Sequence, residues 1–288
     1  MKIYGIYIGY DCVTIAVRNI GKQAVVPLLV QPLDKTMDRE SQVLAAFSEI
    51  IGKKKRLEIK GVDVAAISFE SPENVCFMTV AASEIPDITE MMSWEMFTRT
   101  GEPVKDYNIS AFHTFNDIYF VAGSRIKEIM FYRKLIGRLG LKVAVVQPSL
   151  AAALNVMEMN YKMVGVLLVA FLSQHKIVIA LLENGKLKDM WENSLLSHQR
   201  ITSKDVMKGR AEISKKHAIS EHTTLYITGD LLADKDYAES IVNDMQDCTL
   251  LDPFCRISAS DTTDKELLQN HSFIFGAAVS LSMERVKV

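Results

Sequence analysis

The sequence lacks most features that mark specialised protein classes. Its four cysteines are scattered, with no C-x-x-C pair and no histidine at zinc-ligand spacing. This pattern argues against a disulfide or zinc framework and predicts buried free thiols in a reducing cytoplasm. The longest apolar run, Met163 to Phe171, is too short to span a bilayer. The first residues show no signal-peptide pattern, so we expect a cytoplasmic protein without a leader.

Excess charge and the familiar catalytic motifs are also missing. The formal net charge is −2 in 288 residues, which gives no reason to expect a nucleic-acid partner. Neither a Gly-x-Ser-x-Gly elbow nor a Gly-x-x-x-x-Gly-Lys-Ser/Thr loop occurs. The 49% hydrophobic content is ordinary for a soluble globular chain long enough for two packed lobes.

What the sequence does contain is a repeated β-hairpin pattern, at residues 5–21 and again at residues 169–185. Residue n of the first copy aligns with residue n + 164 of the second, so that Tyr7 matches Phe171 and Gly9 matches Ser173. Each copy is an apolar run, a short polar turn and a β-branched run, which predicts a hairpin. We interpret the shared offset of both turns as a duplication that places two subdomains across a cleft.

Strand and helix patterns alternate along the rest of the chain, which predicts an α/β fold. We expect strands at 23–31, 62–69, 74–80, 104–112, 117–122, 141–146, 186–192 and 224–228, and a strand and turn at 249–254. We expect helices at 37–51, 88–99, 125–139, 149–159, 202–217, 236–245 and 273–283, the helix at 125 being capped by Gly123-Ser124. The small residues Gly276 to Ala278 would let the last helix approach a sheet closely.

The run Lys53-Lys54-Lys55-Arg56 has two interpretations. It can be a solvated helix end, where cations favour the negative pole of the helix dipole. It can also contact an anionic membrane face. Four charges in a protein of near-neutral balance do not decide between the two.

The order of motifs resembles the actin-like ATPase superfamily, and within it the PilM family of type IV pilus assembly, over nearly the whole chain. The matching segments are Tyr7-Ile8-Gly9, Ile85-Pro86, Trp94-Glu95, Asp106-Tyr107, Ala122 to Arg125, Val146 to Pro148, Asp252 to Phe254 and Gly276 to Leu281. The resemblance implies duplicated subdomains of ribonuclease H-like fold that flank a cleft. It implies a first lobe at 1–72 and 123–160, a small α+β subdomain inserted at 73–122, and a second lobe at 161–288, with a reduced part around 197–222.

The chain departs from the superfamily where the chemistry of ATP hydrolysis resides. The resemblance implies an Asp in each hairpin that holds magnesium, but Tyr7 and Phe171 stand at those positions. A phenol is not a magnesium ligand at neutral pH, because tyrosine titrates near pH 10, and phenylalanine offers no ligand. In the second turn, Ser173 stands where the resemblance implies a glycine. Asp230 follows Gly229, and an acid at that position would repel a nearby phosphate. We therefore expect a pseudo-ATPase with no catalytic residues, no metal and no required cofactor.

ATP binding without hydrolysis remains an alternative. If it is retained, the backbone positions expected to contact nucleotide are Gly9, Tyr10, Asp11 and Gly229. Asp11 can equally be a simple turn former. His175, in the second turn, can contact an anion or be an exposed turn residue.

The resemblance implies a scaffold role at the cytoplasmic face of an inner membrane, with membrane association indirect and an oligomer allowed. The expected partner is the short cytoplasmic tail of a single-span, PilN-like pilus protein, bound as an extended peptide. Candidate anchors on the inserted subdomain are Ile85, Met91, Met92 and Trp94, although Trp94 can instead belong to the subdomain's own core.

Three other functions stay open at this stage. An active or nucleotide-regulated actin-like ATPase is the first. The cytoplasmic domain of a type II secretion platform protein is the second, although that class continues into a membrane helix and we expect none here. The third is a cell-division membrane tether, whose amphipathic terminal helix would be longer than residues 283–288.

Overall fold

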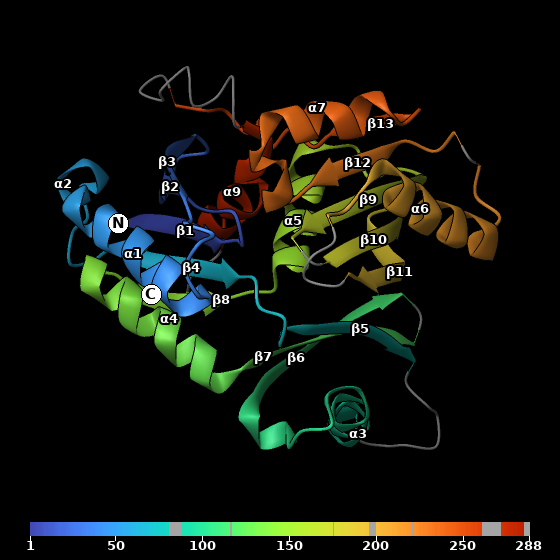
Figure 1. Ribbon diagram of the computed structural model, residues 1–288, viewed down its shortest axis with the longest axis horizontal. Helices are drawn as coiled ribbons and strands as arrows, with labels where there is room; N and C mark the ends of the chain where they lie inside the picture. The colour runs from blue at the N-terminus through green and yellow to red at the C-terminus, as the bar shows by residue number, and fades with distance from the viewer. Residues whose placement is uncertain are drawn as a thin grey trace.

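The computed structural model describes residues 1–80, 88–115, 117–174, 176–195, 200–220, 222–260 and 272–284. They form two five-stranded sheets and one three-stranded sheet, arranged as two lobes with a smaller subdomain below them (Figure 1). The predicted α/β class is confirmed. Within these ranges, no helix combines the length and the apolar character that crossing a membrane would require.

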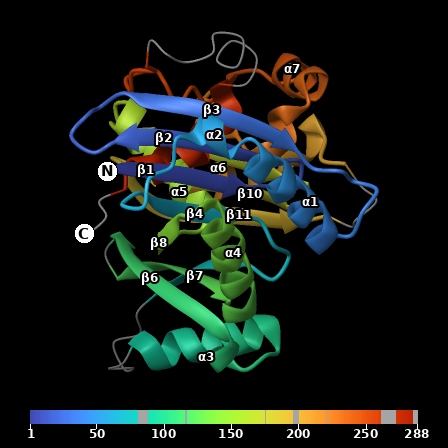
Figure 2. The same ribbon diagram turned by 90° about the vertical axis from the view of Figure 1, so that its left-hand side faces the viewer.

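The first sheet has the order β3-β2-β1-β4-β8. Its strands are β1 (Lys2–Ile8), β2 (Cys12–Asn19), β3 (Val25–Pro32), β4 (Val64–Phe69) and β8 (Lys142–Val146). Helices α1 (Arg39–Gly52) and α4 (Ile126–Leu139) cover its outer face, and the short α2 (Lys54–Leu57) lies beside them (Figure 2). Phe47 of α1 and Ile136 of α4 are fully buried in the core beneath these helices.

The second sheet has the matching order β11-β10-β9-β12-β13. Its strands are β9 (Val166–Ser173), β10 (Lys176–Glu183), β11 (Lys186–Ser194), β12 (Leu225–Thr228) and β13 (Cys248–Leu250). Helix α6 (Ser203–His217) lies on β10 and β11, and α7 (Lys235–Asn243) covers the β13 end. Gly209 makes close packing of α6 possible, because a Cβ there would lie 2.4 Å from the Trp191 ring.

The strand register confirms that the two hairpins are equivalent. In the first hairpin Ile8 pairs with Val13, and in the second Leu172 pairs with Ile177. These pairs are related by the same offset of 164 that the sequence predicted. Each hairpin continues into a third antiparallel strand, so both lobes start from the same β-meander.

The inserted subdomain is a three-stranded antiparallel sheet of order β5-β7-β6 with one helix on its far face. Its elements are β5 (Val75–Val80), α3 (Ile88–Thr100), β6 (Tyr107–Phe115) and β7 (Ile118–Arg125), with a 3-10 turn at Val104–Asp106. Met96 of α3 packs on Phe77 and Val121 in a small core. The opposite face of the sheet, with Phe120 and Ala122, joins the core of the second lobe.

Two helices fill the space between the five-stranded sheets. Helix α5 (Ser149–Asn160) and the last helix, α9 (Gly276–Ser282), pack against each other in the centre of Figure 1. The predicted close approach of α9 is confirmed, since a Cβ on Gly5 of β1 would lie 1.9 Å from the Ala278 carbonyl oxygen. Helix α9 therefore packs on the first sheet, although its residues fall in the segment assigned to the second lobe. The buried residues of α5, assigned to the first lobe, belong to the core of the second.

Most other predicted elements agree with the structure to within a few residues, including the strand and turn at 249–254, where the strand is Cys248–Leu250. Two details were wrong. Gly123 and Ser124 lie inside β7 and do not cap α4, because the strand runs on to Arg125. The last helix is interrupted, with a 3-10 turn at Ser272–Phe275 before α9.

Candidate functional site

The two hairpin turns face each other across the junction of the lobes, and aromatic rings fill the position between them. Tyr7 of β1 and Phe171 of β9 meet edge to face, with ring centroids 6.5 Å apart and an interplanar angle of 84°. Both side chains are buried. The two positions at which the resemblance implied metal-binding carboxylates are therefore packed together as part of the apolar core.

The carboxylate of Asp230 binds the first turn. Its Oδ2 accepts hydrogen bonds from the backbone N–H groups of Tyr10 and of Asp11, the latter at 3.0 Å. Asp230 is fully buried, and a Cβ on Gly9 would lie only 2.4 Å from its Oδ2. Gly9 thus makes room for a side chain of this chain's own second lobe. Two successive N–H groups that point at one anion are the arrangement that binds phosphate in other proteins.

The remaining polar groups of the turn are also occupied. The Gly9 N–H donates to the Cys12 carbonyl at 2.9 Å. The Arg39 guanidinium donates to the Gly9 carbonyl at 2.8 Å and lies over the Tyr10 ring. Because buried N–H groups are normally paired once, the turn as folded has no free N–H for a phosphate. The site does not fit a magnesium-bound triphosphate.

Gly229 places Asp230. Its φ of +129° is accessible essentially to glycine alone, and a Cβ there would lie 2.0 Å from the Leu172 carbonyl oxygen. The chain therefore passes directly over the end of β9 before the 3-10 turn Asp230–Ala233 begins. Gly229 is one of the positions expected to contact a nucleotide if binding is retained, and in the structure its backbone lies against the second lobe's own strand β9.

The electrostatics of this junction disfavour added negative charge. The pKa of Asp230 is raised from 3.8 to about 7. Burial is the largest cause and the neighbouring Glu70 and Asp11 carboxylates add to it, while the two backbone N–H donors oppose the rise. Burial likewise raises the pKa of Glu70, although Ser149, Lys176 and Arg39 counteract that shift. The pKa of the Tyr7 phenol is raised well above 10 by burial and by Asp230. Within the described ranges, no group of three or more His, Cys, Asp or Glu side chains is arranged to hold a metal ion.

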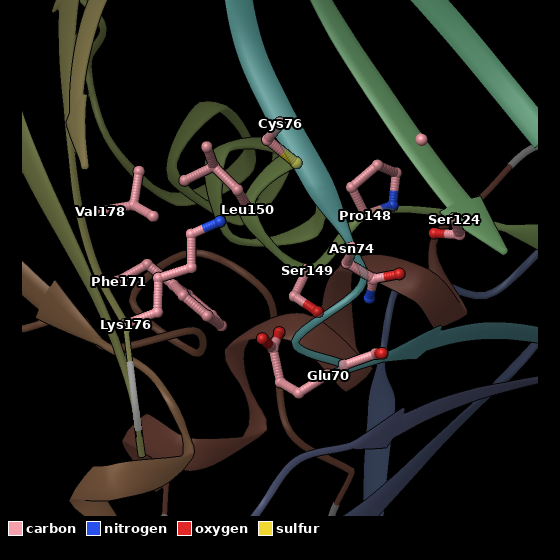
Figure 3. A pocket seen from close by; sticks show the side chains of 12 residues that line it. Glu70, Asn74, Cys76, Ser124, Pro148, Ser149, Leu150, Phe171, Lys176 and Val178 are labelled. Atoms are coloured by element: carbon pink, nitrogen blue, oxygen red, sulfur yellow. The ribbon is translucent and has the colours of Figure 1, made fainter. Parts of the chain in front are cut away.

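Glu70 and Ser149 also lie at this junction, although neither was predicted as a site residue. Glu70 follows β4 directly, its N–H donates to the Ile8 carbonyl at 2.8 Å, and its side chain points towards Ser149 at the start of α5 (Figure 3). Ser149 also lies 2.7 Å, Oγ to Oγ, from Ser68. The available signal was an acid immediately after a buried parallel strand, since the carboxyl ends of such strands line the cleft of α/β folds.

A polar cavity of about 710 Å³ lies beside this junction, between the inserted subdomain and the second lobe. Lys176 of β10 projects into it and forms an ion pair with Glu192 at 2.8 Å. The lining side chains are mixed in charge, and include Tyr10, Glu70, Ser71, Asn74, Arg99, Lys176 and Glu192. The mixture of charges gives the cavity no strong preference for an anion.

The three predicted partner anchors that the structure describes lie in different environments. Met91 is buried within the subdomain, and Met92 packs against its small core. Trp94 is 67% exposed on the outer side of α3, so the alternative of a core tryptophan was wrong. Ile85 lies outside the described residues, as does His175. Only Trp94 of the described anchors presents a large side chain to solvent.

Comparisons with known proteins place this geometry in a known fold. No family model matches the chain, and no curated protein matches it. A chain of the PilM-PilN type IV pilus biogenesis complex aligns over 98% of this chain and 97% of its own length, with a TM-score of 0.72 and 13% identity. A Bacteroides thetaiotaomicron protein with an actin-like ATPase fold aligns over 88% and 91%, with a TM-score of 0.61 and 13% identity. The cytoplasmic domain of EpsL, an inner membrane component of the Vibrio cholerae type II secretion system, aligns over 99% and 97%, with a TM-score of 0.50 and 8% identity. The chain therefore has the actin-like ATPase fold, as the resemblance implied.

Proposed function

We propose that this protein is a non-catalytic scaffold of an inner-membrane assembly platform that binds the cytoplasmic tail of a single-span membrane protein. The fold similarity to a component of a PilM-PilN pilus biogenesis complex supports this role. The similarity to the EpsL cytoplasmic domain supports the same role in a type II secretion system as a second candidate. In both cases the fold would organise other proteins at a membrane.

The loss of ATP hydrolysis in this proposal rests on one observation above all. The Asp230 carboxylate occupies the N–H groups of the first turn, where a phosphate would otherwise bind. With Tyr7 and Phe171 packed at the centre, neither lobe offers a carboxylate at the predicted magnesium positions. Asp230 also links the two lobes through this buried contact.

The inserted subdomain offers a docking site for an extended peptide at strand β6. This strand pairs only with β7 in the described ladders, so its outer edge has backbone groups available for an added strand. Beside it is a hollow of about 300 Å³. Its apolar lining includes Phe112, Phe120, Ala151, Leu154, Leu182 and Leu187. Phe112 is 45% exposed at the mouth, where an apolar side chain of a peptide would cover it.

Charge around the hollow indicates the kind of peptide that fits. Glu158 and Glu284 lie at its rim, and burial raises the pKa of Glu284. A tail that brings a Lys or Arg beside these carboxylates would pair with them and would favour the charged form of Glu284. Cytoplasmic segments next to a membrane helix are rich in Lys and Arg, so such a tail has the required chemistry.

A pull-down from detergent-solubilised membranes tests the proposal, followed by calorimetry with the synthetic tail of any single-span protein recovered. We expect Phe112→Asp to weaken tail binding by at least about tenfold, because a charge would face the apolar hollow. The matched control is Phe97→Asp, which alters an exposed ring on α3, away from the hollow. Equal loss in both variants would contradict docking at β6.

Calorimetry with magnesium and ATP tests the other half of the proposal. We expect no binding heat from the purified chain. Tight, magnesium-dependent ATP binding together with no recovered membrane partner would favour the actin-like ATPase alternative.

A further inference from the structure

The topology of the first lobe collects exposed basic residues at one end. Strands β1, β4 and β8 are parallel and begin at the same end of the sheet, as the pairing of Val64 with Ile3 and with Lys142 shows. The β2–β3 turn after Asn19 lies at this end too, because Asn19 pairs with Lys2. Helix α2 and the C-terminal end of α4 lead into β4 and β8, so both are brought there.

We call this end the basic pole. It carries six exposed cations, none of which forms an ion pair with another residue in the described ranges: Lys22, Lys55, Arg56, Lys60, Arg138 and Lys142. The acids at the pole are already committed, since Glu58 pairs with Lys2 and Asp63 is buried and accepts backbone N–H groups. The whole chain has 33 basic and 35 acidic side chains, so this concentration of positive charge is local.

Aliphatic side chains are exposed among these cations. Val62 is 65% exposed in the loop that starts at Lys60, and Ile20 is 47% exposed at the β2–β3 turn. Both occupy short turns that project beyond the strand ends. Exposed aliphatic side chains in turns, each two residues from a lysine, are suited to enter the headgroup region of a bilayer while the lysines meet phosphates.

We propose that the basic pole binds the surface of an anionic phospholipid bilayer directly. Positive charge alone would also suit a nucleic acid, but Val62 and Ile20 have nothing to bind in a nucleic-acid groove, and a bilayer gives them an apolar phase. This inference goes beyond the partner-mediated membrane association of the proposed function. Of the run at residues 53–56, the proposal assigns Lys55 and Arg56 to the membrane contact, whereas Lys53 pairs with Glu49 and donates to Gln31.

The test is co-sedimentation of the purified full chain with phosphatidylcholine vesicles, with and without phosphatidylglycerol, at low and high salt. We expect binding only to the anionic vesicles, and weaker binding at high salt because exposed charges are screened. The double variant Lys60→Gln, Lys142→Gln should reduce the partition coefficient about 25-fold, since each cation at an anionic surface contributes about fivefold. The control, Lys204→Gln with Lys208→Gln on the exposed side of α6, should bind as the unmodified chain does.

A second pair of variants tests the aliphatic tips. Val62→Asp should reduce binding to anionic vesicles at least about fivefold, whereas Val164→Asp, at a position 78% exposed in the second lobe, should not. The proposal would be overturned by equal binding to both vesicle types, or by equal effects of each variant and its control. Binding to duplex DNA without binding to vesicles would overturn it too. Binding of the tail peptide by the Lys60→Gln, Lys142→Gln variant separates this result from the fate of the scaffold proposal.

Discussion

The buried carboxylate of Asp230 should make the stability of the folded chain depend on pH in a direction unusual for an acid. Its pKa is raised from 3.8 to about 7 by burial and by Glu70 and Asp11, so the folded state holds this proton more tightly than the unfolded state does. Stability from this group is then fully present below about pH 4 and is lost as pH rises towards 7. Each unit of pKa corresponds to about 1.4 kcal/mol, so the full loss is about 4 kcal/mol.

The substitution Asp230→Asn isolates this effect. The amide oxygen can still accept the N–H groups of Tyr10 and Asp11, but the group no longer titrates. Between about pH 5 and about pH 8, the free energy of unfolding of the unmodified chain should fall by about 2 to 3 kcal/mol relative to the variant. Any constant penalty from the amide is the same at every pH and leaves this difference unchanged.

Urea denaturation of both chains at several pH values in this range is the assay. The control is Asp236→Asn, which removes an exposed carboxylate on α7 and reports the effect of net charge alone. A difference between the unmodified chain and Asp230→Asn that stays flat with pH would refute the view that Asp230 is buried at the lobe junction. If the unmodified chain instead loses stability relative to Asp230→Asn as pH falls, the pKa of Asp230 is not raised by folding.

Two further predictions concern the same junction. Gly229→Ala should lower the free energy of unfolding by at least about 2 kcal/mol, because φ is +129° and a Cβ would lie 2.0 Å from the Leu172 carbonyl oxygen. The control is Gly61→Ala, where a Cβ meets open space, and it should change the free energy of unfolding by less than about 0.5 kcal/mol. Arg39→Met removes the guanidinium that donates to the Gly9 carbonyl and should cost about 1.5 to 3 kcal/mol. The exposed Arg133→Met on α4 is its control, and similar losses in the two variants would show that the contact to the turn contributes nothing specific.

Local sequence patterns determined the elements of this protein and their duplication. Hydrophobic periodicity gave α1 and α4 nearly to the residue, because each must bury one face on a sheet. The repeated hairpins predicted two equivalent lobes, because alternation within a strand fixes its register. The replacement of both acids by Tyr7 and Phe171 was also visible in the sequence.

Contacts between distant segments were decided only by the tertiary structure. Asp230 meets the N–H groups of Tyr10 and Asp11 across some 220 positions of chain, and no local pattern encodes that pairing. The sequence marked Asp230 as an acid that would repel a phosphate, but only the fold showed that its carboxylate accepts the N–H groups of the first turn. Topology likewise decided the placement of α5 and α9 between the sheets. It also gathered the cations of the basic pole where the parallel strands begin, because strand direction brings together residues that are distant in the sequence.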